Sequence, residues 1–160
     1  MNKVIFLDRD GTINKKIENG YVTRPYEFEF LPGAIESLKL LAANGFEIII
    51  ITNQRGIARG IFTEDDLLDV HTHMQRELGE HGIPIKAVYY CPHDEGDGCS
   101  CRKPKPGMLL RAAGERAINL PDAVMIGDHE SDVLAAEAAG CRGILIDGEF
   151  NLLAAVKKLV

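Results

Sequence analysis

The chain has 160 residues, the size of one ordinary domain, and it leaves no room for a second catalytic domain. Hydrophobic residues make up 46% and charged residues 26% of the sequence, a balance that argues against disorder. The 18 basic and 24 acidic residues give a formal charge of −6, so the surface is a poor general attractor of nucleic acid or anionic membranes. We expect neither of these as a partner.

The hydrophobic pattern predicts no membrane span and no leader. The longest uniform aliphatic run, residues 48–51, falls far short of the roughly 20 apolar residues that a membrane helix needs. The apolar run at residues 4–7 is too short for a secretory signal. We therefore expect a cytoplasmic protein. No heptad or exposed apolar stripe stands out, so we expect a monomer.

Apolar runs and helical patterns alternate along the chain. Continuously apolar runs predict strands that are buried on both faces of a parallel sheet, at residues 4–7, 47–51, 87–90, 123–126 and 143–146. Helices are predicted between Pro32 and Asn44, between Thr63 and Gly82, from Pro106 onwards, and over residues 131–139 and 152–159. This order predicts one α/β domain over residues 1–160. Its Rossmann-like parallel sheet of about five strands should carry helices on both faces.

Two loops are not explained by a buried core. Residues 14–29 are polar, and residues 91–106 are rich in Cys, Gly, Asp and Pro. Long loops in a compact domain are often functional. Ligands of parallel sheets bind beyond the carboxyl ends of the strands, so we expect a site there.

Two acidic side chains follow the first predicted strand. Asp8 and Asp10 are two residues apart, so they point to the same side of an extended chain, and Gly11 permits a sharp turn. One carboxylate can attack a substrate while the other moves protons, or both can hold a hard cation such as Mg²⁺. The alternative is a polar strand end followed by an ordinary Asp-Gly turn.

Further polar residues occupy comparable places later in the chain. Thr52 ends the second strand, and Asp128 follows the fourth, where it is either a metal ligand supported by Asp132 or only a helix cap. Lys103 stands beside prolines just before a helix, so it is either a phosphate ligand or part of a solvated basic loop. The combined order of acids, hydroxyl, lysine and acid is more specific than any one part.

The sequence resembles the haloacid-dehalogenase (HAD) phosphohydrolase superfamily in four motifs: Asp8-x-Asp10-Gly11-Thr12, Thr52, Lys103 and Gly127-Asp128-x3-Asp132. The resemblance implies that Asp8 attacks phosphorus and forms an aspartyl-phosphate, while Asp10 protonates the leaving oxygen and then activates water. It also implies that Thr52 and Lys103 stabilise the phosphoryl oxygens. Mg²⁺ would be held by Asp8, Asp128 and the backbone carbonyl of Asp10.

The second loop carries a candidate metal site. Three thiols and an imidazole come from Cys91, His93, Cys99 and Cys101. Four such ligands close a tetrahedral zinc site, so we expect a structural Zn²⁺ in a zinc-binding loop over residues 91–103. Because this loop runs directly into Lys103, the metal would also fix the phosphate-binding lysine. The alternative is a set of reduced cysteines without a metal.

The connection between Thr12 and Thr52 is too short for a large cap domain, so loops must select the substrate. Within the superfamily, the cysteine pattern and missing cap are similar to two groups. One group removes the 7-phosphate of D-glycero-D-manno-heptose 1,7-bisphosphate, and the other consists of histidinol-phosphate phosphatases. The strings at 8–14, 19–22, 52–64, 89–93 and 101–109 resemble the first group. This implies a small phosphorylated sugar as substrate and a role in lipopolysaccharide or glycan synthesis.

The same resemblance implies a set of substrate-binding residues: Glu18, Asn19, Gly20, Tyr21, Asn53, Gln54, Arg55, Arg102 and His129. Arg55 stands where that group usually has a serine, and His129 where lysine or arginine is usual. The alternatives are a phosphatase for histidinol phosphate or another small phosphomonoester, a phosphotransferase, and a non-catalytic zinc-stabilised binding module. The cations Arg55 and Arg102 suit an anionic sugar better than a cationic amino alcohol.

Overall fold

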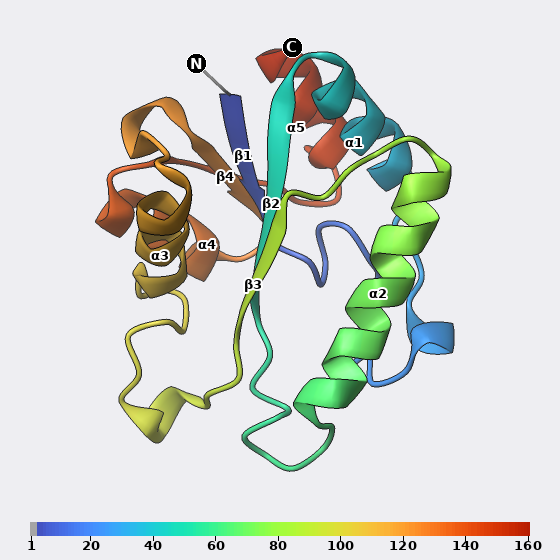
Figure 1. Cartoon of the computed structure of the whole chain (residues 1–160), viewed down its shortest axis with the longest axis vertical. Coiled ribbons are helices and arrows are strands. Elements are labelled where there is room, and N and C mark those ends of the chain that lie inside the picture. Colours follow the sequence, from blue (N-terminus) through green and yellow to red (C-terminus); the bar gives the residue numbers. More distant parts are fainter. Residues whose placement is uncertain (1–2) are drawn as a thin grey trace.

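The computed structural model describes residues 3–160. Five parallel strands form one sheet with the spatial order β3-β2-β1-β4-β5 (Figure 1). The strands are β1 (Lys3–Leu7), β2 (Phe46–Asn53), β3 (Ala87–Cys91), β4 (Val124–Gly127) and β5 (Arg142–Leu145). All five predicted strands are confirmed, with ends that differ by at most two residues.

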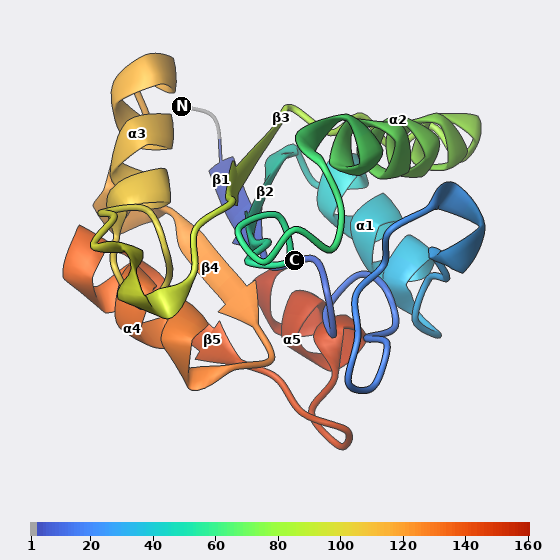
Figure 2. The same cartoon turned by 90° about the horizontal axis from the view of Figure 1, so that it is seen from below.

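Helices cover both faces of the sheet, as predicted (Figure 2). Helices α1, α2 and α5 pack on one face, where they share a core with Ile5 and Leu7 of β1. Helices α3 and α4 pack on the other face with Phe6. Alternate residues of one apolar strand thus fill both cores. The helices are α1 (Ala34–Ala43), α2 (Glu64–Glu80), α3 (Gly107–Arg116), α4 (Glu130–Ala139) and α5 (Leu152–Leu159).

Local signals in the sequence set the helix ends. Thr63 Oγ1 accepts a hydrogen bond from the backbone N–H of Asp66 at 3.1 Å, and the Asp66 carboxylate accepts one from Thr63 N at 2.9 Å. This is the predicted capping box at the start of α2. Gly140 ends α4 with φ +85°, a left-handed conformation that a residue without a side chain adopts at little cost.

Parallel pairing aligns the carboxyl ends of the strands at one edge of the sheet. Leu7 of β1 pairs with Ile50 of β2 and with Ile126 of β4. The polar residues that follow these strands therefore lie side by side. Loops 53–63 and 91–106 gather at the same edge, at the bottom of Figure 1.

The connection from β1 to β2 contains a loop, a short 3₁₀ turn at Pro25–Glu27 and α1, and it holds no large cap domain, as predicted. Within residues 3–160, no helix has both the length and the apolar character that a membrane crossing requires.

Candidate active site

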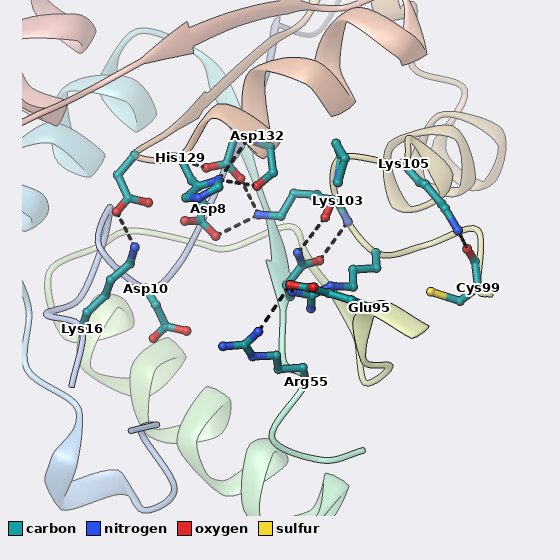
Figure 3. A pocket seen from close by; sticks show the side chains of 15 residues that line it. Asp8, Asp10, Lys16, Arg55, Glu95, Cys99, Lys103, Lys105, His129 and Asp132 are labelled. Atoms are coloured by element: carbon teal, nitrogen blue, oxygen red, sulfur yellow. Dashed lines mark hydrogen bonds and ion pairs between the residues drawn. The ribbon is translucent and has the colours of Figure 1, made fainter. Parts of the chain in front are cut away.

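Lys103 lies at the centre of a buried group of charges (Figure 3). Its Nζ donates to Asp8 Oδ1 at 2.9 Å, to Asp132 Oδ1 at 2.6 Å and to the carbonyl oxygen of Ile51 at 2.9 Å. These contacts use all three protons of the ammonium group. The other oxygen of Asp132 accepts the backbone N–H of His129 at the start of α4. Asp132 therefore fixes Lys103 against Asp8.

Asp8 is a buried carboxyl group among other charges. Burial raises the pKa of Asp8 to about 8. The positive charge of Lys103 acts to lower this pKa, and the carboxylates of Asp132 and Asp128 act to raise it. A cation close to Asp8 favours the ionised form of this carboxyl group.

Asp10 is held by hydrogen bonds on both of its oxygens. Oδ1 accepts from Arg9 Nη2 at 2.7 Å and from Asn14 Nδ2 at 2.9 Å, and Oδ2 accepts from Gln54 Nε2 at 3.0 Å. Burial alone would raise the pKa of Asp10, but the charge of Arg9 and these hydrogen bonds hold it below its usual value. The two acidic residues are thus shifted in opposite directions.

Polar residues at the carboxyl end of β2 form hydrogen bonds that hold Lys103 and Asp10 in place. The buried Thr52 Oγ1 accepts from Gln54 Nε2 at 2.9 Å. Asn53 forms two hydrogen bonds with the backbone of Lys103. Its Nδ2 donates to Lys103 O at 3.2 Å, and its Oδ1 accepts from Lys103 N at 3.0 Å. Gln54 is only 1% exposed and turns toward Asp10. The amide of Gln54 therefore has internal partners, as a buried amide requires, and its role at the substrate stays a prediction.

Asp128 is placed to hold a metal ion. Its Oδ1 is buried without a hydrogen-bond partner among the described residues, and its Oδ2 pairs with Lys16 Nζ at 2.8 Å. Carboxylate oxygens of Asp8, Asp128 and Asp132 lie within 4.8 Å of one another. Gly11 has φ +85°, and a Cβ at this position would clash with the Asp128 carboxylate. An unpaired buried oxygen among carboxylates fits Mg²⁺.

A cavity of about 600 Å³ lies over these groups, and a smaller cavity of about 180 Å³ adjoins it. Arg55 and Arg102 line both cavities, and their guanidinium groups lie 3.5 and 3.7 Å from the carboxylate of Glu95. Arg102 Nη1 is buried and has no partner within residues 3–160. A buried, unpaired cationic N–H in a cavity wall fits an anionic ligand.

Comparisons with known proteins agree with this geometry. A family model described as HAD-hydrolase-like matches residues 100–158. The D-glycero-beta-D-manno-heptose-1,7-bisphosphate 7-phosphatase of Pasteurella multocida is 45% identical over 152 residues, covering 91% of this chain and 82% of that protein. The chain belongs to the HAD family of phosphoric monoester hydrolases. The predicted resemblance is confirmed.

Two further comparisons extend the match to this HAD phosphatase. The Helicobacter pylori protein of the same name (strain ATCC 700392 / 26695) is 43% identical, covering 91% of this chain and 83% of its own length. The crystal structure of a D,D-heptose 1,7-bisphosphate phosphatase from B. bronchiseptica, complexed with magnesium and phosphate, aligns with a TM-score of 0.92 and 33% identity. That alignment covers 98% of this chain and 97% of the other.

The remaining residues that the HAD resemblance assigned to the substrate divide into two groups. Gly20 and Tyr21 line the smaller cavity, and His129 lines the larger one. Glu18 and Asn19 are exposed and line neither.

Three of the four predicted zinc ligands come together in this HAD phosphatase. The sulfur atoms of Cys91, Cys99 and Cys101 lie within 4.8 Å of one another, and all three cysteines are free. Three soft thiol donors at this separation fit Zn²⁺. His93 lies outside the cluster: its side chain is 46% exposed and its Nδ1 lies 4.0 Å from Asp97 Oδ2. The imidazole must turn toward the sulfurs to complete a set of four ligands.

Sequence reasoning missed four polar residues that surround the catalytic groups. Arg9 and Asn14 hold Asp10, Lys16 pairs with Asp128, and His71 contacts Arg9 from α2. Arg9 lies inside the first motif, and its position between Asp8 and Asp10 could have indicated that it pairs with one of these acids. The other contacts depend on how the loop and α2 pack.

Acid should destabilise this HAD phosphatase through His71. Burial, and then the charge of Arg9, lowers the pKa of His71 from 6.5 to about 3. The unfolded chain takes up a proton here near pH 6.5, whereas the folded chain does not. Above about pH 6.5, His71 is neutral in both the folded and the unfolded chain, so it causes no loss of stability. Below that pH only the unfolded chain gains the proton, so the free energy of unfolding declines as the pH falls. From this one group, we expect the free energy of unfolding to fall by about 2 kcal/mol between about pH 7 and pH 5.

Urea denaturation over this pH range measures the effect. The variant His71→Gln should lose this part of the pH dependence. His81→Gln, which changes an exposed histidine after α2, should keep the slope of the wild type. An unchanged slope in His71→Gln would contradict the expectation.

Proposed function

We propose that this chain removes the 7-phosphate of D-glycero-β-D-manno-heptose 1,7-bisphosphate through an aspartyl-phosphate on Asp8. The observation that supports this best is a single cavity that is lined by Asp8 and Lys103 and also by the basic side chains of Arg55 and Arg102. Such a cavity offers cations to two phosphates. The related phosphatases from Pasteurella multocida and Helicobacter pylori act on this sugar, and the B. bronchiseptica phosphatase, complexed with magnesium and phosphate, supports magnesium as the metal.

The protein groups account for both steps of the reaction. An oxygen of Asp8 attacks phosphorus, a bond to phosphorus forms, and the bond to the sugar oxygen breaks. Asp10 gives a proton to that leaving oxygen as the general acid of this step. Water then attacks the phosphoryl group and releases Asp8, while Asp10 takes a proton from the water.

Charge neutralisation limits this chemistry, because a carboxylate must approach a phosphate of the same sign. We assign the phosphoryl oxygens to Lys103, which exchanges one of its present contacts for the phosphate, and to Thr52, because preorganised donors of this kind contribute strongly. Asp8, Asp128 and the carbonyl of Asp10 would hold Mg²⁺, which supplies positive charge to the phosphoryl group when bound. The unpaired Oδ1 of Asp128 supports that assignment.

The second phosphate and the sugar hydroxyls are assigned to the basic side chains of the cavities. Arg102 carries the buried unpaired N–H, and Arg55 is held in place by Tyr21, whose hydroxyl accepts from Nε at 3.0 Å. His129 at the cavity wall also caps α4, because its Nδ1 accepts from the N–H of Ser131. We include a monomeric state and a cytoplasmic location in the proposal. The free thiols of the cysteine loop accord with a reducing compartment.

A substrate panel tests the proposal. Phosphate release with Mg²⁺ should be fastest, by kcat/KM, for the β anomer of the heptose bisphosphate. The comparison substrates are the α anomer, histidinol phosphate and fructose 1,6-bisphosphate. A preference for histidinol phosphate would favour the second candidate group, and equal slow turnover of all four would remove the substrate assignment while keeping the phosphatase.

Removal of zinc should lower the activity, because the cysteine loop leads directly into Arg102 and Lys103. We expect zinc-free protein, or the variant Cys101→Ser, to lose about tenfold or more in kcat/KM at saturating Mg²⁺. Zinc content and activity are measured on the same samples. Cys141→Ala is the matched control, because this buried cysteine lies outside the loop and bonds to Ala123 O. Full activity without zinc would contradict the role.

A further inference from the structure

Arg9 is a completely buried cation whose side chain has partners on two sides. It is 0% exposed, although it lies between the two catalytic acids in the sequence. Its Nε and Nη2 donate to Asp10 Oδ1 at 3.2 and 2.7 Å, and its Nη1 contacts His71 Nε2 at 3.0 Å. The guanidinium group therefore joins α2 to Asp10.

The chemistry of this contact fixes the form of His71. A guanidinium group only donates hydrogen bonds, so His71 Nε2 must accept, and the ring proton must reside on Nδ1. The imidazole is therefore neutral. It lies on the inner face of α2 and is 6% exposed. The contact joins residues 62 positions apart, so it is a tertiary contact and not a local one.

We propose that His71 is a positioning residue for Asp10 and acts through Arg9. The inference rests on the proposed role of Asp10 as the acid that protonates the leaving oxygen. His71 fixes one arm of the guanidinium group, and the opposite edge then holds Asp10 Oδ1 in a set orientation. Without the acceptor on His71, Arg9 Nη1 is left buried and unpaired. The guanidinium group then turns to find another partner, and the geometry of Asp10 is lost.

Leaving groups of different basicity test this role. A sugar alkoxide needs a proton as it leaves, whereas 4-nitrophenolate leaves readily without one. For His71→Leu we expect kcat/KM with the heptose bisphosphate to fall about tenfold to 100-fold, and with 4-nitrophenyl phosphate by less than about threefold. The ratio kcat/KM reports the steps up to formation of the aspartyl-phosphate. His71→Gln, whose Oε1 can accept from Arg9, should recover most of the lost rate.

Two comparison variants separate positioning from a loss of packing. Met74→Ala removes an equally buried side chain from the same helix and leaves Arg9 untouched. It should lower the melting temperature without changing the ratio of the two substrates. If His71→Leu does not fold, His71→Asn takes its place, because the shorter amide falls short of Arg9. Equal losses on both substrates, or no recovery in His71→Gln, would overturn the inference.

Asp10→Asn distinguishes failure of the inference from failure of the proposed function. It should show the same substrate selectivity as His71→Leu, but with a larger loss. If Asp10→Asn loses activity selectively and His71→Leu does not, only the positioning role fails. If Asp10→Asn leaves turnover of the sugar phosphate unchanged, Asp10 is not the acid, and the role of Asp10 in the proposed function fails together with the positioning role of His71.

Discussion

Asp8→Asn should lower the rate of phosphate release by about 10³-fold or more, because an amide oxygen cannot replace the carboxylate that attacks phosphorus. The fold should survive. Burial raises the pKa of Asp8 to about 8 against the charge of Lys103, and the carboxylates of Asp132 and Asp128 raise it further. The Oδ1 of an asparagine can still accept from Lys103 Nζ. A neutral amide relieves that repulsion, so we expect the free energy of unfolding to stay within about 1 kcal/mol of the wild type.

The measurement pairs steady-state phosphate release with acid quenching of the enzyme during turnover. Wild-type protein should retain phosphate that is labile in base, as an acyl phosphate is, and Asp8→Asn should retain none. Circular dichroism and the melting temperature establish that the variant is folded. Activity within tenfold of the wild type in freshly purified Asp8→Asn would refute the nucleophile assignment.

Lys103→Met should affect both activity and stability. The ammonium group lies between Asp8 and Asp132 and is only 4% exposed, so methionine leaves two buried carboxyl groups without their cation. Breaking a buried ion pair by removing one partner costs about 3–5 kcal/mol. We also expect kcat to fall about 10²-fold to 10³-fold, because a preorganised donor to the phosphoryl oxygens is lost.

The loss of stability in Lys103→Met should depend on pH. Without Lys103, the buried Asp8 carboxyl group is ionised only at a larger cost, so it retains its proton to higher pH than in the wild type. The variant should therefore lose more stability at about pH 8 than at about pH 5. Urea denaturation at both values tests this, with Lys39→Met on the exposed face of α1 as the control. Unchanged stability at both pH values would show that Lys103 does not pair with these acids.

Several features of this protein were determined by the sequence alone. Continuous apolar runs predict the five strands, and local caps such as Thr63 with Asp66 predict where helices begin. Each of these signals involves residues that are close together in the sequence, so it does not depend on how distant segments of the chain pack. The site motifs were also predictable, because parallel strands carry Asp8, Thr52 and Asp128 to the same edge of the sheet.

Tertiary structure alone decided the partners of those residues. Asp132 was expected to support a metal ligand, and it also holds Lys103, which is 29 positions away. Gln54 was expected at the substrate, and the structure shows that its amide also donates to Asp10. The buried contact between Arg9 and His71 joins the first strand end to α2. Such pairings arise because every buried donor and charge must find a partner, and which partner is near depends on how distant segments pack.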